Sequence, residues 1–379
     1  MIYFDNAATT KPSKNAVDAF LKSCDVYWAN PSALHSFGEE VFFELKKSRD
    51  NIKNLLNIKK GEIYFTSSAT ESINLFFKGL LKKGDHLIIS EYEHSAVYES
   101  AKLFENEGGE VTYLKAKNGI IDPEDVRSSI KDNTKLVAIM FVNNEIGAIN
   151  PVQEISRLIK NINPNIKFFV DGVQAVGKTH VDLNELNCDG FTLSAHKFHG
   201  LKGTGLLYVK DTHIHPQILG GGQESSMRSG TENVGGIFAL NAALADAVNN
   251  LEKNIDYVGS IKQRFIDNLK DFPGVRINSP ENSVPNILNI SFKGIKAEVL
   301  VHMLEESEIY VNTSSACSKN GHKKSRTLLA LDLSDEDIRG ALRFSFSDYN
   351  SLEEVDFACE KIKEAVERMR LILWENAYL

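Results

Sequence analysis

The sequence predicts an α/β protein with a large, mostly parallel sheet of seven strands and a smaller α+β domain near the C-terminus. Between residues 61 and 210, short apolar runs alternate with amphipathic helical patterns. This alternation is typical of a parallel sheet with helices on both faces. Beyond residue 282 the strands and helices follow a different order. With 379 residues, 42% of them hydrophobic, the chain is large enough for two cores.

Seven apolar runs predict the strands of the large sheet, and helical patterns lie between them. The expected strands are Ile63–Thr66, Leu87–Ser90, Val111–Leu114, Leu136–Phe141, Lys167–Val170, Gly190–Leu193 and Gly205–Val209. The expected helices are Ser72–Leu81, Ser95–Phe104, Pro123–Ile130 and Val152–Lys160. No long helical pattern separates the last two strands, which favours one antiparallel strand at that point.

A glycine cluster, Gly220-Gly221-Gly222, marks a break before the remaining elements. A long helical pattern then runs from Thr231 to about Leu269, and we expect an interruption near Asp256. The further elements are a strand Pro285–Phe292, a helix Ala297–Glu305, a strand Ile309–Val311, a loop Asn312–Arg326, a strand Ala341–Phe346 and a helix Leu352–Trp374. We expect residues 14–255 to form the large domain, and residues 1–13 and 256–379 to form the small one.

Charge and cysteine content exclude several classes of protein. The formal net charge of −8 argues against a general electrostatic attraction to nucleic acid or to an anionic membrane. No run is apolar for the length of a membrane span, and the start of the chain lacks a secretory pattern. Cys24, Cys188, Cys317 and Cys359 are scattered, without a CxxC pair. We therefore expect a cytoplasmic protein without zinc, in which Cys188 and Cys359 are small buried residues.

A lysine and a carboxylate follow two of the predicted strands. Asp171 ends the apolar run Phe168-Phe169-Val170, and Lys197 lies in Ser194-Ala195-His196-Lys197 after another. Ligands bind at the carboxyl ends of strands in open α/β sheets. Pyridoxal phosphate needs such a pair, because the lysine forms a Schiff base with its aldehyde and the carboxylate keeps its ring nitrogen protonated. The alternatives are a solvated lysine and a helix-capping aspartate.

Other polar residues follow neighbouring strands. The stretch Ser67-Ser68-Ala69-Thr70-Glu71-Ser72 begins a helical pattern. It is a candidate for binding a phosphate or for capping the helix, and the two roles are compatible. His94 is a candidate for proton transfer or an ordinary loop histidine. Asn144 is a candidate for binding a cofactor hydroxyl or a substrate carboxylate, or else an ordinary turn residue.

Two residues of the C-terminal part are candidates for roles in catalysis or substrate binding. Cys317 is followed by Lys319, His322, Lys323 and Lys324, which favour a thiolate; the alternative is a free cysteine in a flexible basic loop. Arg343 lies inside the apolar strand and needs a partner there, either a substrate carboxylate or a structural Asp or Glu.

Taken together, these segments resemble the NifS/IscS-type cysteine desulfurases, fold-type I pyridoxal-phosphate enzymes of aminotransferase class V. The resemblance runs nearly end to end, and the ordered set of motifs is specific although each motif alone is weak. The motifs are Phe4-Asp5-Asn6-Ala7-Ala8-Thr9-Thr10, Asn30-Pro31-Ser32, Thr66-Ser67-Ser68-Ala69-Thr70-Glu71-Ser72, Glu93-His94, Val142-Asn143-Asn144-Glu145-Ile146-Gly147, Asp171-Gly172-Val173-Gln174, Ser194-Ala195-His196-Lys197, Gly220-Gly221-Gly222-Gln223-Glu224, Arg228-Ser229-Gly230-Thr231-Glu232-Asn233, Ser315-Ala316-Cys317 and Arg343-Phe344-Ser345.

The resemblance implies a role for each matching residue. Lys197 would be the Schiff-base lysine, Asp171 would pair with the ring nitrogen, and Gln174 would contact the ring hydroxyl. His94 would stack on the ring and transfer protons, and Cys317 would be the nucleophile. The phosphate would be bound by Ala69, Thr70, Ser194 and His196, and by Thr231 of a neighbouring subunit. Asn144 and Arg343 would hold the substrate carboxylate.

The implied activity is the removal of sulfur from L-cysteine, which leaves L-alanine and a persulfide on Cys317. The sulfur would pass to an acceptor protein, an iron–sulfur scaffold or a tRNA-thiolation enzyme. A homodimer would share the active site, with no direct contact to nucleic acid or membrane. The spacing from Cys317 to Ser325 suggests the longer-loop branch of the family. No long acceptor-docking tail is expected after the last helix.

The chain departs from the family pattern in three loops. Glu224-Ser225-Ser226 replaces Glu-Arg-Gly, Ser347-Asp348 replaces a glycine and a basic residue, and Lys324 replaces a proline. A selenocysteine lyase or another class V enzyme is the alternative within the fold. A dinucleotide-dependent oxidoreductase fits poorly, because no G-x-G-x-x-G follows the first strand. A non-catalytic relative is disfavoured by the presence in one chain of Lys197, Asp171, His94 and Cys317.

Overall fold

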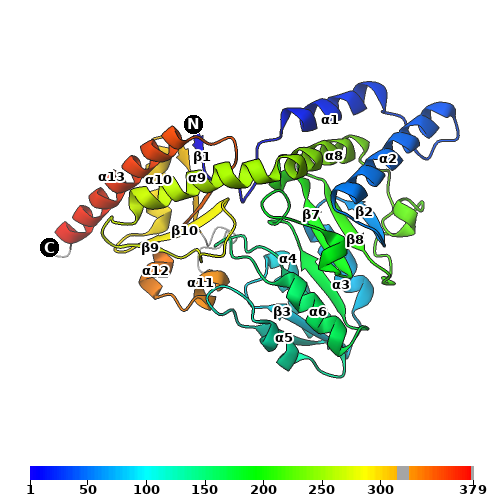
Figure 1. Ribbon diagram of the computed structural model, residues 1–379, viewed down its shortest axis with the longest axis horizontal. Coiled ribbons are helices and arrows are strands. Elements are labelled where there is room, and N and C mark those ends of the chain that lie inside the picture. Colours follow the sequence, from blue (N-terminus) through cyan, green and yellow to red (C-terminus); the bar gives the residue numbers. More distant parts are fainter. Residues whose placement is uncertain (314–323, 377–379) are drawn as a thin grey trace.

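The computed structural model describes residues 1–313 and 324–376. Its larger sheet has seven strands and lies on the right in Figure 1. The strand order is β2-β8-β7-β6-β5-β3-β4. The strands are β2 Glu62–Thr66, β3 His86–Ser90, β4 Glu110–Leu114, β5 Thr134–Met140, β6 Lys167–Asp171, β7 Gly190–Ser194 and β8 Gly205–Val209. Only β8 is antiparallel to its neighbours β2 and β7. The seven predicted strands and the single antiparallel strand are confirmed.

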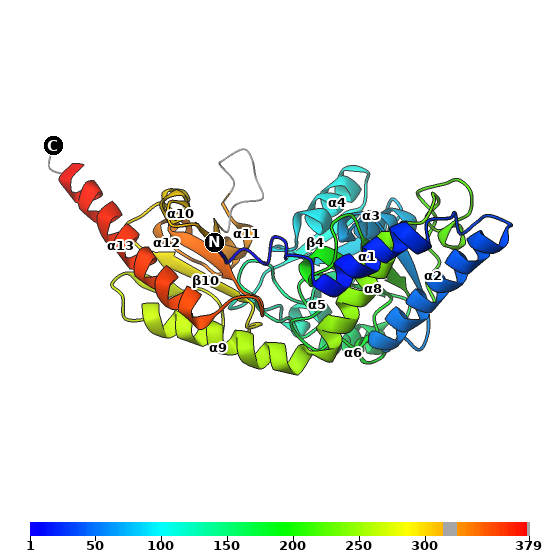
Figure 2. The ribbon, with the colours of Figure 1, turned by 90° about the horizontal axis from the view of Figure 1, so that it is seen from above.

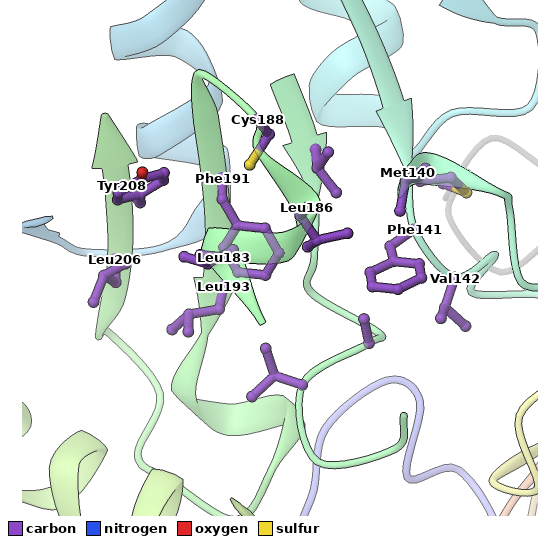
Figure 3. Packing of buried hydrophobic residues seen from close by; sticks show 14 of the residues in the cluster. Met140, Phe141, Val142, Leu183, Leu186, Cys188, Phe191, Leu193, Leu206 and Tyr208 are labelled. Atoms are coloured by element: carbon purple, nitrogen blue, oxygen red, sulfur yellow. The ribbon is translucent and has the colours of Figure 1, made fainter. Parts of the chain in front are cut away.

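Helices cover the sheet and bury its strands. They include α3 Ala69–Leu80, α4 Ser95–Asn106, α5 Pro123–Ser129, α6 Val152–Ile162 and the single turn α7 Leu183–Leu186. Every residue of β3, β7 and β8 is buried, which explains their continuous apolar sequences. Figure 3 shows part of this core, where Phe191 and Leu193 lie beside Leu183 and Leu186, and Cys188 points inward. The expectation that Cys188 is a small buried residue is confirmed.

Two long helices, α1 Lys14–Val26 and α2 Ser36–Leu55, were not predicted from the sequence. They pack along α8 Val234–Asn249 at the outer side of the large sheet (Figures 1 and 2). Only Ala16 and Ser23 of α1 are buried, so its apolar stripe is short. Several large apolar side chains on these helices are exposed, among them Phe42 and Phe43.

The predicted long helix is interrupted at Asn250, not near Asp256. Helix α8 ends at Asn249 and α9 Leu251–Leu269 follows at once, so that the two run end to end from the large sheet to the small one (Figure 1). The backbone of Asn250 leaves the helical region, with φ −105° and ψ 10°, and its side-chain amide donates to the Asp246 carbonyl at 2.8 Å. This local hydrogen bond competes with helix propagation, whereas Asp256 sits inside α9 without disturbing it.

A second, four-stranded antiparallel sheet follows in the order β12-β13-β10-β9. Its strands are β9 Val275–Ile277, β10 Ile287–Phe292, β12 Asn312–Thr313 and β13 Ala341–Ser345, and it is accompanied by α10 Ala297–Glu305, α11 Arg326–Ala330, α12 Asp335–Arg339 and α13 Leu352–Asn376. Strand β12 lies where a loop was expected. Cys359 of α13 is buried, as predicted.

The N-terminus packs against the core of this second sheet and pairs in a separate two-stranded sheet. Strand β1 Ile2–Tyr3 pairs in parallel with β11 Ile309–Tyr310, and Phe4 packs in the same core as Phe265 and Phe344. The chain then crosses to the large sheet, whose core contains Ala7. No helix in the described ranges combines the length and the apolar character that crossing a lipid bilayer requires.

Candidate active site

A cavity of about 390 Å³ opens at the carboxyl ends of the large-sheet strands and extends to the small sheet. Ten residues predicted for the site line it together: Ala69, Thr70, His94, Asn144, Asp171, Gln174, Ser194, His196, Lys197 and Arg343. Thr231 is exposed and is not among the lining residues of this cavity. Cys317 lies outside the described residues. The structure therefore collects ten of the twelve predicted residues around one space.

Lys197 and Asp171 occupy the positions that the sequence predicted for them. Asp171 is the last residue of β6, and Lys197 ends a 3₁₀ turn that follows β7. The Lys197 Nζ donates to the carbonyl oxygens of Ala7 at 2.9 Å and Ala8 at 2.8 Å. Burial raises the pKa of Asp171, while the nearby His94 and Lys197 oppose this rise. A cationic group facing Asp171 would keep its carboxylate ionised.

The N-terminus of α3 forms another wall of the cavity. The Ser68 hydroxyl caps this helix by accepting from the Glu71 N–H at 3.3 Å, so the capping alternative holds for Ser68. The Ser194 hydroxyl accepts from the Ala69 N–H at 2.9 Å. Backbone N–H groups and the dipole of a helix N-terminus favour an anion, and the pKa of His196 is lowered to about 4, chiefly by burial. His196 is therefore a neutral donor or acceptor beside this wall.

His94 exposes much of its surface, but it faces the cavity and burial by the surrounding groups lowers its pKa. Its Nδ1 accepts from the Ala96 N–H at 3.1 Å, so the neutral ring carries its proton on Nε2. The preceding residue, Glu93, is buried, and its Oε1 accepts from the Ser90 hydroxyl and the Met140 N–H. Burial raises the pKa of Glu93 to about 8. Its burial was not predicted from the sequence.

Arg343 has a structural partner and also lines the cavity. Its Nη2 donates to Asp5 Oδ1 at 2.8 Å, and its Nη1 donates to the Asn144 carbonyl at 3.0 Å. The sequence left open whether Arg343 binds a substrate or an acidic residue, and the structure shows the acidic residue as Asp5. The sequence motif that contains Asp5 does not by itself indicate this contact.

A further titratable group lies behind Lys197. The Lys178 Nζ donates to the Lys197 carbonyl at 3.0 Å, and burial together with the charge of Lys197 lowers its pKa to about 7. Lys178 and Lys197 both line a second cavity of about 290 Å³. No sequence pattern indicated this lysine, because its burial depends on elements distant in the chain.

The residues that line the cavity of about 390 Å³ fit pyridoxal phosphate. The Gln174 Nε2 donates to the Ala7 carbonyl at 2.9 Å, but its Oε1 is buried without a hydrogen-bond partner among the described residues. A ring hydroxyl would supply the missing donor. A protonated ring nitrogen suits the buried Asp171, and a phosphate suits the start of α3. The Lys197 amine supplies the group that reacts with an aldehyde.

Comparisons with known proteins agree with this geometry. A family model described as aminotransferase class-V matches residues 2–357. A cysteine desulfurase IscS of Dictyoglomus turgidum is 37% identical over 98% of this chain and 96% of its own length. A NifS/IcsS protein homolog of Lactobacillus delbrueckii subsp. bulgaricus is 40% identical over 94% of both chains.

Similar solved structures also include a NifS-like protein and a cysteine desulfurase. A NifS-like protein superimposes with a TM-score of 0.91 at 34% identity, covering 97% of this chain and 99% of its own. The apo structure of a cysteine desulfurase from Thermococcus onnurineus NA1 gives a TM-score of 0.86 at 26% identity, covering 97% and 94%. These similarities extend over both sheets and the cavity between them.

Proposed function

This chain belongs to the aminotransferase class V family, among the NifS/IscS-type cysteine desulfurases, and we propose that it uses pyridoxal phosphate to take sulfur from L-cysteine for an acceptor protein. One observation carries the proposal. A single cavity is lined by an amine, Lys197, by a buried carboxylate, Asp171, and by an arginine, Arg343, that can receive the carboxylate of an amino acid.

The large-sheet side of the cavity would hold the cofactor. Bound pyridoxal phosphate supplies an aldehyde that reacts with amines and a ring that accepts electrons from the substrate. Asp171 would hold the proton on the ring nitrogen, and the Gln174 amide would bind the ring hydroxyl. The phosphate would be bound at the start of α3 by Ala69, Thr70, Ser194 and neutral His196.

The small-sheet side would hold the substrate. Arg343 Nη1 contacts the Asn144 carbonyl, so these two residues can bind one carboxylate together. The Lys197 amine would accept a proton from the substrate carbon, and His94 would carry protons at Nε2. The position of these side chains in the lining of the cavity supports the proposed roles.

Sulfur transfer would use Cys317 as the nucleophile. Its thiolate attacks the sulfur of the bound L-cysteine, so that a sulfur–sulfur bond forms as the carbon–sulfur bond breaks. The electron pair of the broken bond stays with the carbon, which is then protonated to give L-alanine. Covalent catalysis divides a difficult reaction into two easier steps, of which the second delivers the persulfide sulfur to the acceptor.

The proposal includes a homodimer and a division into two domains. Thr231 is exposed outside the cavity, which is consistent with a role at the phosphate site of a second copy. Residues 14–255 would form the large domain, and residues 1–13 and 256–379 the small one. The acceptor would be an iron–sulfur scaffold or a tRNA-thiolation enzyme, since relatives named IscS match over nearly the whole chain.

Product analysis tests the proposed function. The purified protein is incubated with L-cysteine and a thiol reductant, and alanine and sulfide are measured. We expect both products from the wild type, loss of the covalently held cofactor in Lys197→Ala, and a coloured but inactive Cys317→Ala. Undiminished sulfide from Cys317→Ala would instead support a lyase, and absence of alanine from the wild type would reject the proposal.

A further inference from the structure

We infer that Asp5 is a substrate-positioning residue, whose carboxylate orients the Arg343 guanidinium so that it receives the carboxylate of the amino-acid substrate. This inference rests on the proposed function, because it names a further residue of the same site. Asp5 comes from the N-terminal segment, and Arg343 comes from β13 at the far end of the chain.

The hydrogen bonds of Arg343 fix its guanidinium at two of three nitrogens. Nη2 is bound to Asp5 Oδ1 at 2.8 Å and Nη1 to the Asn144 carbonyl at 3.0 Å. The third nitrogen, Nε, is buried without a hydrogen-bond partner among the described residues. Since a guanidinium carries more N–H donors than these two contacts use, it retains donors for a carboxylate.

Asp5 is itself held from both sides. Its Oδ2 accepts from the Asn312 amide at 2.9 Å, and Asn312 also lines the cavity. The side chains of Arg343 and Asp5 expose only 9% and 15% of their surfaces. A buried guanidinium without a partner would be unfavourable, so Asp5 is the counter-charge that keeps Arg343 in place before an amino acid binds.

The backbone fixes the position of Asp5 relative to Arg343. Ser345, two residues beyond Arg343 on β13, donates its N–H to the Phe4 carbonyl at 2.7 Å. The Ser345 hydroxyl accepts from the Ala7 N–H at 2.8 Å, and its carbonyl accepts from the Asn6 side chain at 2.9 Å. These contacts lie on both sides of Asp5, so its backbone cannot move away from β13 without breaking them.

The same segment reaches the proposed cofactor side of the cavity. The carbonyl oxygens of Ala7 and Ala8 accept from Lys197 Nζ, and Ala7 also accepts from Gln174. Residues 5–8 therefore connect the proposed carboxylate-binding arginine to the reactive lysine. We expect substitutions at Asp5 to alter binding of the substrate carboxylate in particular, because the contacts of Ala7 and Ala8 use backbone atoms that remain.

The test compares ligands with and without a carboxylate on the cofactor-loaded enzyme. Kinetic constants are measured with L-cysteine, and dissociation constants for L-alanine and cysteamine are measured from the absorbance of the bound cofactor. In Asp5→Ala we expect KM for L-cysteine and the constant for L-alanine to rise about tenfold, the scale of one charge-assisted hydrogen bond, with kcat within about twofold. Cysteamine, which lacks a carboxylate, should bind as to the wild type.

Two further variants keep the test decisive if Asp5→Ala does not fold. Asp5→Glu retains the charge but moves it by one methylene, and we expect the same selective rise in KM. Asp5→Asn retains an oxygen acceptor for Nη2 but removes the counter-charge, and we expect KM to rise less than in Asp5→Ala. Asp356→Ala is the matched control, because it removes an Arg–Asp pair with Arg264 at 2.7 Å that lies away from the cavity.

The outcomes separate the inference from the proposed function. If the wild type releases no alanine from L-cysteine, the proposed function fails. The inference is overturned if the wild type is active but Asp5→Ala and Asp5→Glu leave KM for L-cysteine unchanged. It is also overturned if these variants weaken the binding of L-alanine and of cysteamine equally, because Asp5 then does not act on the carboxylate site.

Discussion

Glu93 combines full burial with an incompletely satisfied carboxyl group beside the cavity. Its Oε2 has no hydrogen-bond partner among the described residues, and burial raises its pKa to about 8. The folded protein therefore keeps a proton on Glu93 at pH 7, whereas the unfolded chain has released it. Between the unfolded pKa and pH 8 the folded state binds more protons, so the free energy of unfolding falls as the pH rises.

We expect Glu93→Gln to remove this dependence. The stability of the variant relative to the wild type should increase from pH 5 to pH 8, by up to a few kcal/mol on the scale of about 1.36 kcal/mol for each unit of pKa. Denaturant unfolding at pH 5, 6.5 and 8 measures the difference. A constant difference over this range would show that Glu93 does not change its protonation on unfolding.

The sequence could not predict the hydrogen-bond partners of individual site residues. The carboxyl ends of apolar strands located Asp171, Asn144 and Lys197, because the sheet places such ends at one edge. Nothing local to Asp5 indicates a bond to Arg343, since that contact depends on how β1 and β13 come together. The burial of Glu93 likewise depends on the surrounding elements.

At the scale of elements, strands were predicted more fully than helices. The strands of the large sheet are apolar along their length because helices cover both faces, and this signal is strong. Helices α1 and α2 bury few residues and were not predicted. The left-handed backbone of Glu224, Ser225 and Ser226, with φ of 47°, 54° and 64°, could not be foreseen either, since glycine is the residue that favours it.

The start of α3 depends on a close approach between strand and turn at Gly205. A Cβ at this position of β8 would lie 2.6 Å from the backbone carbon of Ser68 and 2.9 Å from Thr66 Oγ1. Gly205→Ala must therefore shift the turn that leads to Ala69 and Thr70. Because this turn is the proposed phosphate site, we expect cofactor affinity to fall at least about tenfold.

Titration of the cofactor-free protein with pyridoxal phosphate measures this affinity. Gly259→Ala is the control, because a Cβ there meets nothing within 4 Å and the site lies inside α9. Alanine in a helix interior should stabilise the protein by up to about 1 kcal/mol and leave cofactor affinity unchanged. If Gly205→Ala and the wild type bind pyridoxal phosphate with equal affinity, the turn that leads to Ala69 and Thr70 does not form the phosphate site.

At the scale of the whole molecule, the N-terminal segment joins the two sheets. Phe4 lies in the core of the small sheet and Ala7 in the core of the large one, with the cavity between them. The sequence predicted that residues 1–13 belong with the C-terminal part, but it could not show that these residues contact Lys197. Such long-range contacts follow from the packing of both cores.

If the active site is shared between two chains, two inactive variants should restore activity when they form a mixed dimer. If Thr231 serves the phosphate site of the other copy, Thr231→Glu places a negative charge beside that phosphate and inactivates the site in trans. A dimer of Lys197→Ala and Thr231→Glu chains then has one doubly altered site and one intact site. Random pairing of equal amounts should restore about a quarter of wild-type activity, since half of the dimers are mixed and half of their sites are intact.

Co-expression of the two variants, without separation of the dimers, measures this quarter. The mixed dimer, isolated through a different affinity tag on each chain, should have about half of wild-type activity, because one of its two sites is intact. Each variant alone should be nearly inactive, because Lys197→Ala lacks the reactive amine and Thr231→Glu repels the phosphate in both sites. If Thr231 acted within its own chain, the mixed dimer would contain no intact site and would stay inactive. Recovery of activity therefore requires that Thr231 acts at the phosphate site of the other chain.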